Sequence, residues 1–157
     1  MKHIRGLIIA PIMALLGCMA TKQSLNTSFN SDVCIKPLSS YHYLTCCDIQ
    51  FTVDDMQFTI PKDFETDLAS IPKLVWPVLA PAHSSLIRPA IVHDWFYRKT
   101  CEFSRSQTDL IFYHMLRNDG VSRARANIMY YAVRTFGWLY YKKEYCDDGC
   151  NEMDKRP

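Results

Sequence analysis

A histidine and an aspartate stand side by side in the stretch IVHDWFY, residues 91–97, inside an otherwise apolar and aromatic run. A helix that is buried in a core does not need two titratable groups at its centre. His93 and Tyr97 are four residues apart, so on a helix they share a face. The pattern leaves two alternatives open: a catalytic or metal site, or a hydrogen-bonded pair that only stabilises the fold.

A second carboxylate, Asp109, belongs to the helix that is predicted next along the chain. It shares a helical face with Phe112 and Leu116, and the connection TCEFS between the two helices is short, which predicts antiparallel neighbours. We therefore expect Asp109 to lie opposite His93. A carboxylate that accepts from one ring nitrogen leaves the other nitrogen free to act as a base. Asp94 points about 100° away from His93 around its helix, where it could hold a cation or orient a loop.

The elements that must position these groups begin with a β-hairpin. Apolar residues alternate with polar ones in two runs, and the pair Asp54–Asp55 stands between the runs as a two-residue turn. The alternating apolar positions are Ile49, Phe51 and Val53 in the first run and Met56, Phe58 and Ile60 in the second. Pro61 ends the second strand.

Capping signals predict helices over the rest of the chain. A short helix beginning near Pro72 is limited by Pro77. Three longer helices follow: from Ser84 or Ser85 to about Lys99, from a capping box Ser104–Gln107 to about Asn118 before Gly120, and from Ser122 to about Tyr141. The predicted fold class is α+β, with an N-terminal β-hairpin or small antiparallel sheet packed on about three α-helices.

Composition narrows the functional classes. The chain has 157 residues, 48% of them hydrophobic, which is enough for one domain with a core and argues against disorder. A formal net charge of +2 predicts no nucleic-acid partner.

The N-terminus carries export signals. Lys2, His3 and Arg5 precede an apolar run that is too short to span a membrane comfortably, and this run ends in LLGC at Cys18. The stretch resembles the lipobox of bacterial lipoproteins, which implies removal of residues 1–17 and acylation of Cys18. In lipoproteins of this kind a residue such as Met19 after the cysteine, in place of an acidic one, implies sorting to the outer membrane, on the side of the periplasm. The acyl chains would then attach the protein to the membrane. The alternative is an uncleaved anchor or an ordinary secretory signal.

Residues 18–32 are polar and predict a flexible tether, residues 33–146 a single globular domain, and residues 147–157 a polar tail. Removal of Lys2 and Arg5 would leave equal numbers of basic and acidic residues, which argues against an electrostatic grip on anionic lipids.

Six cysteines remain besides Cys18, and an even number in an exported chain predicts disulfides whose pairing stays open. The six candidates are Cys34, Cys46, Cys47, Cys101, Cys146 and Cys150. The alternative is zinc, for which Cys146 and Cys150 have suitable spacing but lack a second spaced pair.

Three motifs in order resemble a phage- and prophage-borne family of unknown function. They are FETDLASIP (64–72), AIVHDWFY (90–97) and TDLIFYHML (108–116), followed by a helix like IMYYAVRTFGW (128–138). The resemblance covers about residues 56–140. It implies a phage or prophage origin and no established activity.

The His-Asp-x-x-Tyr motif with an aspartate on an antiparallel helix is also similar to the core of secreted phospholipases A2. This resemblance implies that His93 is the base, that Asp109 orients it, that Tyr97 bonds to the pair, and that Asp94 binds Ca²⁺. The Gly-rich calcium loop of those enzymes is missing, since no glycine lies between Cys18 and Asp109. Asp67 could partly replace that loop.

The alternative role of Asp67 is to cap the helix near Pro72, together with Ser70. Two functions follow for the whole chain. The first is a hydrolase of the envelope, with a phospholipid ester as its substrate. The second is a non-catalytic protein that binds an outer-membrane protein and excludes superinfecting phage. A metal-dependent phosphohydrolase would need His42 or His83 as a further ligand.

Overall fold

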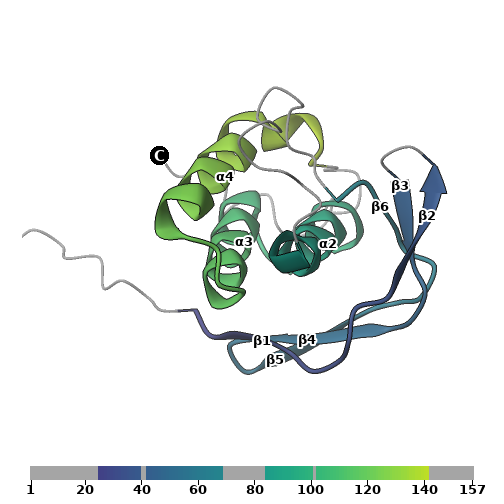
Figure 1. Cartoon of the computed structure of the whole chain (residues 1–157). Helices are drawn as coiled ribbons and strands as arrows, with labels where there is room; N and C mark the ends of the chain where they lie inside the picture. Colours follow the sequence, from purple (N-terminus) through teal and green to yellow (C-terminus); the bar gives the residue numbers. More distant parts are fainter. Residues whose placement is uncertain (1–24, 40–41, 69–83, 101, 142–157) are drawn as a thin grey trace, which may run out of the picture.

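In the computed structural model, residues 25–39, 42–68, 84–100 and 102–141 are described. They form two small antiparallel sheets and three α-helices, which confirms the α+β fold (Figure 1). In chain order the elements are β1 (Thr27–Phe29), β2 (Ile35–Ser39), β3 (His42–Thr45), β4 (Ile49–Val53), β5 (Met56–Ile60), β6 (Glu65–Thr66), α2 (Ser84–Lys99), α3 (Arg105–Asn118), α4 (Arg123–Phe136) and the 3-10 turn η2 (Gly137–Leu139). The predicted short helix from Pro72 lies outside these ranges.

The predicted hairpin is β4 and β5, and its turn is confirmed. Val53 pairs with Met56, so Asp54 and Asp55 form a two-residue loop, and Asp54 has a φ of 51°. Aspartate tolerates this left-handed conformation better than most residues. The alternating positions of β4 are fully buried, because one face of this sheet packs against the helices.

The first sheet contains a third strand that the sequence did not predict. β1 pairs with the outer edge of β4, with Thr27 opposite Val53 and Phe29 opposite Phe51. These residues fall within the range 18–32 that we expected to be a tether, so the folded domain begins before residue 33. Three residues are too few to show an alternating pattern, and pairing with β4 decides their conformation.

The second sheet has the order β2-β3-β6, and it too was not predicted. A disulfide between Cys34 and Cys46 joins its first two strands. β6 is held by Thr45, whose hydroxyl accepts from the Phe64 amide at 2.9 Å. This sheet matters for the site because β6 carries Thr66 to the side of α2.

The helices begin where the capping signals predicted. Ser104 and Gln107 form a capping box before α3, and the Ser122 hydroxyl accepts from the amide of Arg125 at the start of α4. Gly120, with a φ of 84°, follows α3. We expected α4 to reach about Tyr141, but it ends at Phe136 and continues as η2.

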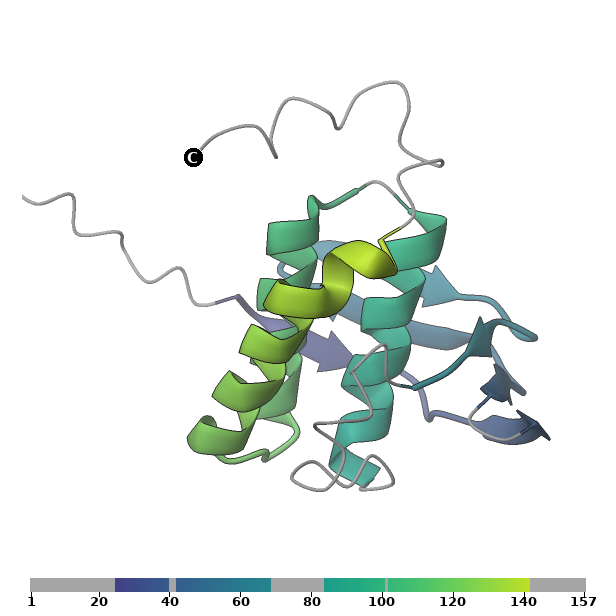
Figure 2. The ribbon, with the colours of Figure 1, turned by 90° about the horizontal axis from the view of Figure 1, so that it is seen from above.

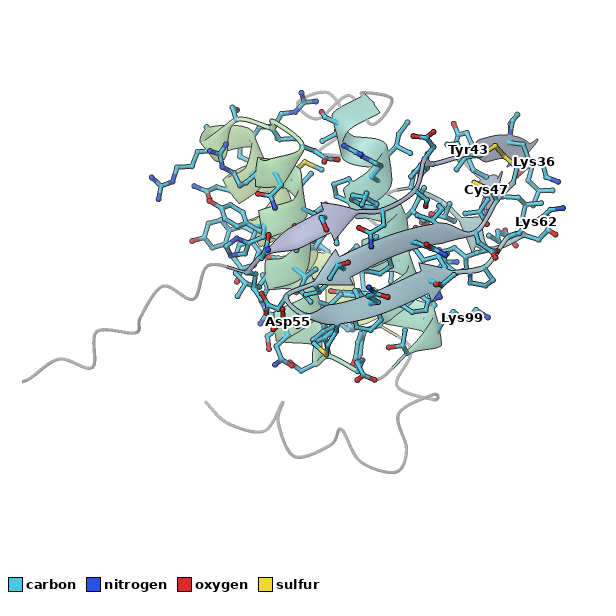
Figure 3. All side chains as sticks on the ribbon, turned by 90° about the horizontal axis from the view of Figure 1, so that it is seen from below. Lys36, Tyr43, Cys47, Asp55, Lys62 and Lys99 are labelled. Atoms are coloured by element: carbon cyan, nitrogen blue, oxygen red, sulfur yellow. A yellow bond between two sulfur atoms is a disulfide. The ribbon has the colours of Figure 1, made fainter. Side chains whose placement is uncertain are left out.

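The elements form layers. The β1-β4-β5 sheet lies on one side, α2 and α3 cover its inner face, and α4 packs on α3 on the side away from the sheet (Figures 1 and 2). From below, the outer face of the sheet is in front, with Asp55 at the β4–β5 turn and Lys36, Tyr43, Cys47 and Lys62 at the opposite end (Figure 3). Within the described ranges, no helix is long and apolar enough to span a membrane.

Candidate functional site

His93 of α2 and Asp109 of α3 are hydrogen-bonded in the interior. Nε2 of His93 lies 2.9 Å from Oδ1 of Asp109, and the two residues are 4% and 0% exposed. The short α2–α3 connection brings the two helices side by side, as their spacing in the sequence suggested. The structure therefore makes this contact, while the catalytic role assigned to the pair stays a prediction.

Asp109 is the centre of a larger polar cluster. Tyr97 donates its hydroxyl to Oδ1 at 2.5 Å, and Arg134 of α4 donates from Nη1 to Oδ2 at 2.9 Å. Arg105, one helical turn before Asp109, places its guanidinium 3.8 Å from the same Oδ2 and also donates to the Arg134 carbonyl. One buried carboxylate thus connects all three helices.

This cluster holds Asp109 in its charged form. Burial raises the pKa of the Asp109 carboxyl, but hydrogen bonds from His93, Tyr97 and Arg134 outweigh burial, and the pKa is lowered. Burial and the neighbouring Asp109 charge raise the pKa of the Tyr97 phenol. Tyr97 therefore stays a neutral donor at ordinary pH, and Asp109 stays an acceptor.

The carboxylate also determines the tautomer of His93. Because Asp109 accepts, the proton of a neutral imidazole belongs on Nε2, and Nδ1 keeps its lone pair. The Nδ1 atom has no hydrogen-bond partner among the residues described. The ring itself packs against Tyr97 and Phe112, at centroid distances of 4.0 and 4.9 Å. Asp109 and the two aromatic rings therefore fix the tautomer and the orientation of the His93 ring.

Asp94 faces a different set of partners from those of His93. Its Oδ2 accepts from the Thr66 hydroxyl at 2.5 Å and from Arg98 Nη2 at 3.2 Å. The Asp67 carboxyl is a neighbour of both Asp94 and Arg98, with its Oδ1 3.6 Å from the same Nη2. Asp94 thus joins α2 to β6, and the expected rotation away from His93 is observed.

The residues around Asp94 do not fit a Ca²⁺ site. Ca²⁺ takes six to eight oxygen ligands, whereas Oδ2 of Asp94 is already bonded to Thr66 and to the cation Arg98. Burial and the neighbouring Asp67 charge raise the pKa of Asp94 to about 7, against the attraction of Arg98. Among the described residues no group of three or more His, Cys, Asp or Glu could hold a metal. We therefore derive no step that uses calcium.

The histidines considered for a phosphohydrolase site are not placed with His93. Nδ1 of His42 lies 2.8 Å from Oε1 of Glu65 at the surface, and both side chains are about half exposed. His83 lies outside the described residues. His42 is thus part of a surface pair of its own.

The cysteine expectations are met at two positions and corrected at one. Cys34 and Cys46 form a disulfide, with a Cα–Cα distance of 5.2 Å. Cys47 was also a disulfide candidate, but it carries a free, half-buried thiol. It follows Cys46 directly in the bend after β3, and its thiol donates to the Asp32 carbonyl at 3.7 Å. The remaining disulfide candidates, Cys101, Cys146 and Cys150, and the expected lipidation site Cys18 lie outside the described residues.

Three parts of the cluster were not predicted. Arg134 was not among the expected site residues, although it pairs with Asp109. Arg105 stands four residues before Asp109, which is a spacing that could have indicated the pair. Gly137 allows close packing, because a Cβ at this position would lie 2.5 Å from the Tyr97 hydroxyl.

Comparison with known proteins adds a family but no activity. A family model described as "Protein of unknown function (DUF1353)" matches residues 46–133, which include His93, Asp94 and Asp109. The uncharacterized protein y4iH of Sinorhizobium fredii (strain NBRC 101917 / NGR234) is 34% identical over 82 residues, covering 50% of this chain and 34% of that protein. The uncharacterized protein y4jT of the same strain is 31% identical over 91 residues, covering 55% of this chain and 27% of that protein.

The chain therefore spans at most about a third of the length of these curated relatives. No solved structure matches it.

Proposed function

The chain belongs to the DUF1353 family of proteins of unknown function, and we propose that this member is a phage- or prophage-encoded, lipid-anchored envelope protein that hydrolyses a phospholipid ester. One observation carries the proposal: His93 is held by Asp109 through Nε2 at 2.9 Å, and this contact leaves Nδ1 as a base. The same arrangement of His93, Asp109 and Tyr97 is similar to the pair of helices in secreted phospholipases A2.

The proposed reaction uses water as the nucleophile. Nδ1 of His93 takes a proton from a water molecule as its oxygen attacks the ester carbonyl carbon, which forms a tetrahedral oxyanion. The oxyanion then collapses, the bond to the alcohol oxygen breaks, and the imidazolium returns the proton to that oxygen. The products are a fatty acid and a lysophospholipid.

Asp109 is the group that supports this proton transfer. An ionised carboxylate on Nε2 stabilises the imidazolium that forms when Nδ1 is protonated, and it keeps the ring in one orientation. Tyr97 and Arg134 donate to both oxygens of Asp109. These contacts keep the carboxylate charged without blocking Nδ1.

Attachment to the envelope rests on Cys18 and the residues before it. We expect a mature protein that begins at an acylated Cys18, because several acyl chains anchor a protein stably. Intact mass spectrometry together with labelled palmitate tests this. An unmodified Cys18 or a retained Met1 would contradict the anchor but would leave the chemistry at His93 open.

The activity test compares two histidine–carboxylate pairs of the same chain. Phospholipid vesicles are offered to the wild type and to His93→Asn, with and without calcium, and released fatty acid is measured. We expect His93→Asn to stay folded and to lose about 10²-fold or more of the activity, the scale of lost general-base catalysis. His42→Asn, which changes the exposed pair with Glu65, is the matched control and should keep full activity.

A folded wild type that releases no fatty acid under either condition contradicts the hydrolase. A loss of activity in His93→Asn that merely follows a loss of folded protein also contradicts it. Circular dichroism of each variant at the assay temperature separates these outcomes.

A second candidate function is favoured by the burial of the pair. His93 is 4% exposed, and the groove of about 660 Å³ beside α2 is lined by Trp95, Arg98 and Phe64 among others, and not by His93. This observation suits a non-catalytic protein that blocks an outer-membrane receptor, in which the pair only stabilises the fold. A folded His93→Asn variant that still protects cells from superinfection would support this function.

A further inference from the structure

Helix α4 has a second apolar face that no described element covers. Ile128, Tyr131 and Thr135 follow one another at helical spacing, and Trp138 and Leu139 of η2 continue the row. Tyr131 and Trp138 are 66% and 65% exposed, and Ile128 and Leu139 are also exposed. A soluble domain seldom leaves such a contiguous group of large apolar side chains in water without an interaction partner. We call this row the α4 face.

The α4 face lies in a segment with an uneven charge. Residues 120–141 contain three basic residues, Arg123, Arg125 and Arg134, and no acidic residue. Arg134 pairs with the buried Asp109, so Arg123 and Arg125 carry the excess charge of this segment. The net charge of the whole chain hides this local excess, and the expectation of no electrostatic contact with lipids was based on the net charge. On a helical wheel Arg123 and Arg134 flank the apolar row on one side and Arg125 on the other.

The position of the face in the fold agrees with the proposed anchor. α4 and η2 lie on the side of the molecule away from the β1-β4-β5 sheet (Figure 2). The start of β1 is held at the end of α3, where Asn118 Nδ2 donates to the Thr27 carbonyl at 3.1 Å and to its hydroxyl at 2.7 Å. Six residues lie between Cys18 and Leu25, so the anchor point lies within about 25 Å of Leu25, which is two residues before Thr27.

We propose that the α4 face lies on the surface of a lipid bilayer that contains anionic phospholipids. Tryptophan and tyrosine favour the boundary between acyl chains and head groups, and arginine beside them attracts anionic lipids. A second copy of the chain is a poorer occupant, since two such faces would bring excess positive charge together. The proposal rests on the membrane attachment in the proposed function, but not on catalysis.

Contact with the bilayer would also bring lipid close to the His93 cluster. Gly137 packs on the Tyr97 hydroxyl, and the Tyr141 ring meets the Tyr97 ring edge-on at 5.2 Å. Tyr97 in turn donates to Asp109. Tyr97 therefore links the residues just before and after Trp138 and Leu139 to the hydrogen-bonded pair.

The test measures where Trp138 lies when the full chain is bound to vesicles. The chain is added to vesicles of brominated phosphatidylcholine, with and without phosphatidylglycerol, and quenching of tryptophan fluorescence by the bromine is recorded for the bound protein. We expect strong quenching that requires Trp138 and increases with phosphatidylglycerol. All measurements use a Trp76→Phe background, so that only Trp95 and Trp138 fluoresce. Trp138→Phe should then remove the quenched component, since Trp95 is partly buried against the core.

A matched reporter on another element controls for location. Leu38 of β2 is 54% exposed, and Leu38→Trp in the Trp138→Phe background should stay unquenched on the same vesicles. Tyr131→Ser with Leu139→Ser should weaken the quenching of Trp138 about tenfold or more, because two large apolar groups no longer enter the lipid. The same experiment in His93→Asn should give unchanged quenching, which separates this proposal from the hydrolase.

Bound protein with an unquenched Trp138, or protein that does not bind vesicles, overturns the proposal. Acrylamide in the absence of vesicles tests the other occupants. If Trp138 is shielded from acrylamide at every dilution, the C-terminal segment of the chain itself covers the face. If the shielding appears only at high protein concentration, a second copy does. Either result replaces the bilayer as the occupant.

Discussion

Arg134 of α4 donates from Nη1 to Oδ2 of Asp109 on α3 at 2.9 Å, while His93 of α2 bonds to the other oxygen of the same carboxylate. The contact ties the outermost helix to the pair that carries the proposed chemistry. It also explains how a carboxylate that is 0% exposed keeps its charge. Its consequences can be tested by changing one partner at a time.

Replacing Asp109 should destabilise the fold strongly. Asp109→Asn leaves Arg134 and Arg105 without their negative partner in the interior, and breaking a buried pair costs about 3–5 kcal/mol. We expect about 3 kcal/mol, since the Arg134 side chain is 29% exposed and water partly compensates. Urea unfolding followed by circular dichroism measures the change.

The control is the ion pair between Asp119 and Arg88. Oδ1 of Asp119 lies 2.8 Å from Arg88 Nη2, but the Arg88 side chain is 42% exposed. Asp119→Asn should therefore cost about 1 kcal/mol or less. If the two variants lose the same free energy of unfolding, the buried pairing of Asp109 contributes no more to stability than the exposed pair does.

Gly137→Ala should disturb Tyr97. The added Cβ would lie 2.5 Å from the Tyr97 hydroxyl and 3.2 Å from two of its ring carbons, and such overpacking costs about 1–3 kcal/mol. Tyr97→Phe removes the closest contact, so the two changes should be non-additive by about 1 kcal/mol. Free energies of unfolding of both single variants and the double variant give this coupling.

Gly120 provides the comparison for that cycle. A Cβ at Gly120 meets nothing within 4 Å, but the backbone φ of 84° strains any other residue. Gly120→Ala should cost about 1–2 kcal/mol, the cost of a left-handed backbone for a residue with a Cβ, and this cost should add simply to that of Tyr97→Phe. A non-additive result here would mean that the cycle does not report a local contact.

Asp94 should make stability depend on pH. Its pKa is raised to about 7 in the folded protein, whereas an unfolded aspartate titrates near 4. Between these values the folded state holds a proton that the unfolded state has lost, so the free energy of unfolding falls as pH rises, by up to about 1.4 kcal/mol per pH unit. Below about pH 4 both states are protonated and this cost is absent.

Asp94→Asn cannot titrate, so it should flatten the stability curve between about pH 4 and 7. Urea unfolding at a series of pH values measures the slope for both proteins. The lowered pKa of Asp109 acts in the opposite sense, because its stabilisation is lost at lower pH as the folded-state pKa is passed. An unchanged slope in Asp94→Asn would contradict the raised pKa of this carboxyl.

The cysteines should differ in reactivity. Cys47 should react with iodoacetamide in the folded, unreduced protein, and Cys34 and Cys46 only after reduction. Peptide mapping of the labelled protein locates each thiol. Loss of the disulfide should cost up to about 3 kcal/mol, since it closes a short loop, and Cys47→Ser should leave stability nearly unchanged. A Cys47 that reacts only after reduction would indicate another pairing.

Much of the fold follows from short-range patterns. The β4–β5 hairpin, the capping box at Ser104, the cap at Ser122 and the stop at Gly120 depend on side chains only a few residues apart. The contact between His93 and Asp109 was also predictable from the sequence, although the two residues are 16 positions apart. A short connection between two amphipathic helices favours antiparallel packing, and this packing brings the two residues together.

The other contacts join residues that are far apart along the chain and carry no local signal. β1 is a strand because β4 offers it an edge, and Asp94 bonds to Thr66 because β6 is brought to α2 by the second sheet. Arg134 reaches Asp109 because α4 packs on α3, while Cys47 is left unpaired because the strands align Cys34 with Cys46. The sequence by itself thus identified His93, Asp94 and Asp109 as candidate residues. Only the tertiary structure decided which groups pair with the two carboxylates, because Coulomb energy and desolvation depend on distances in space.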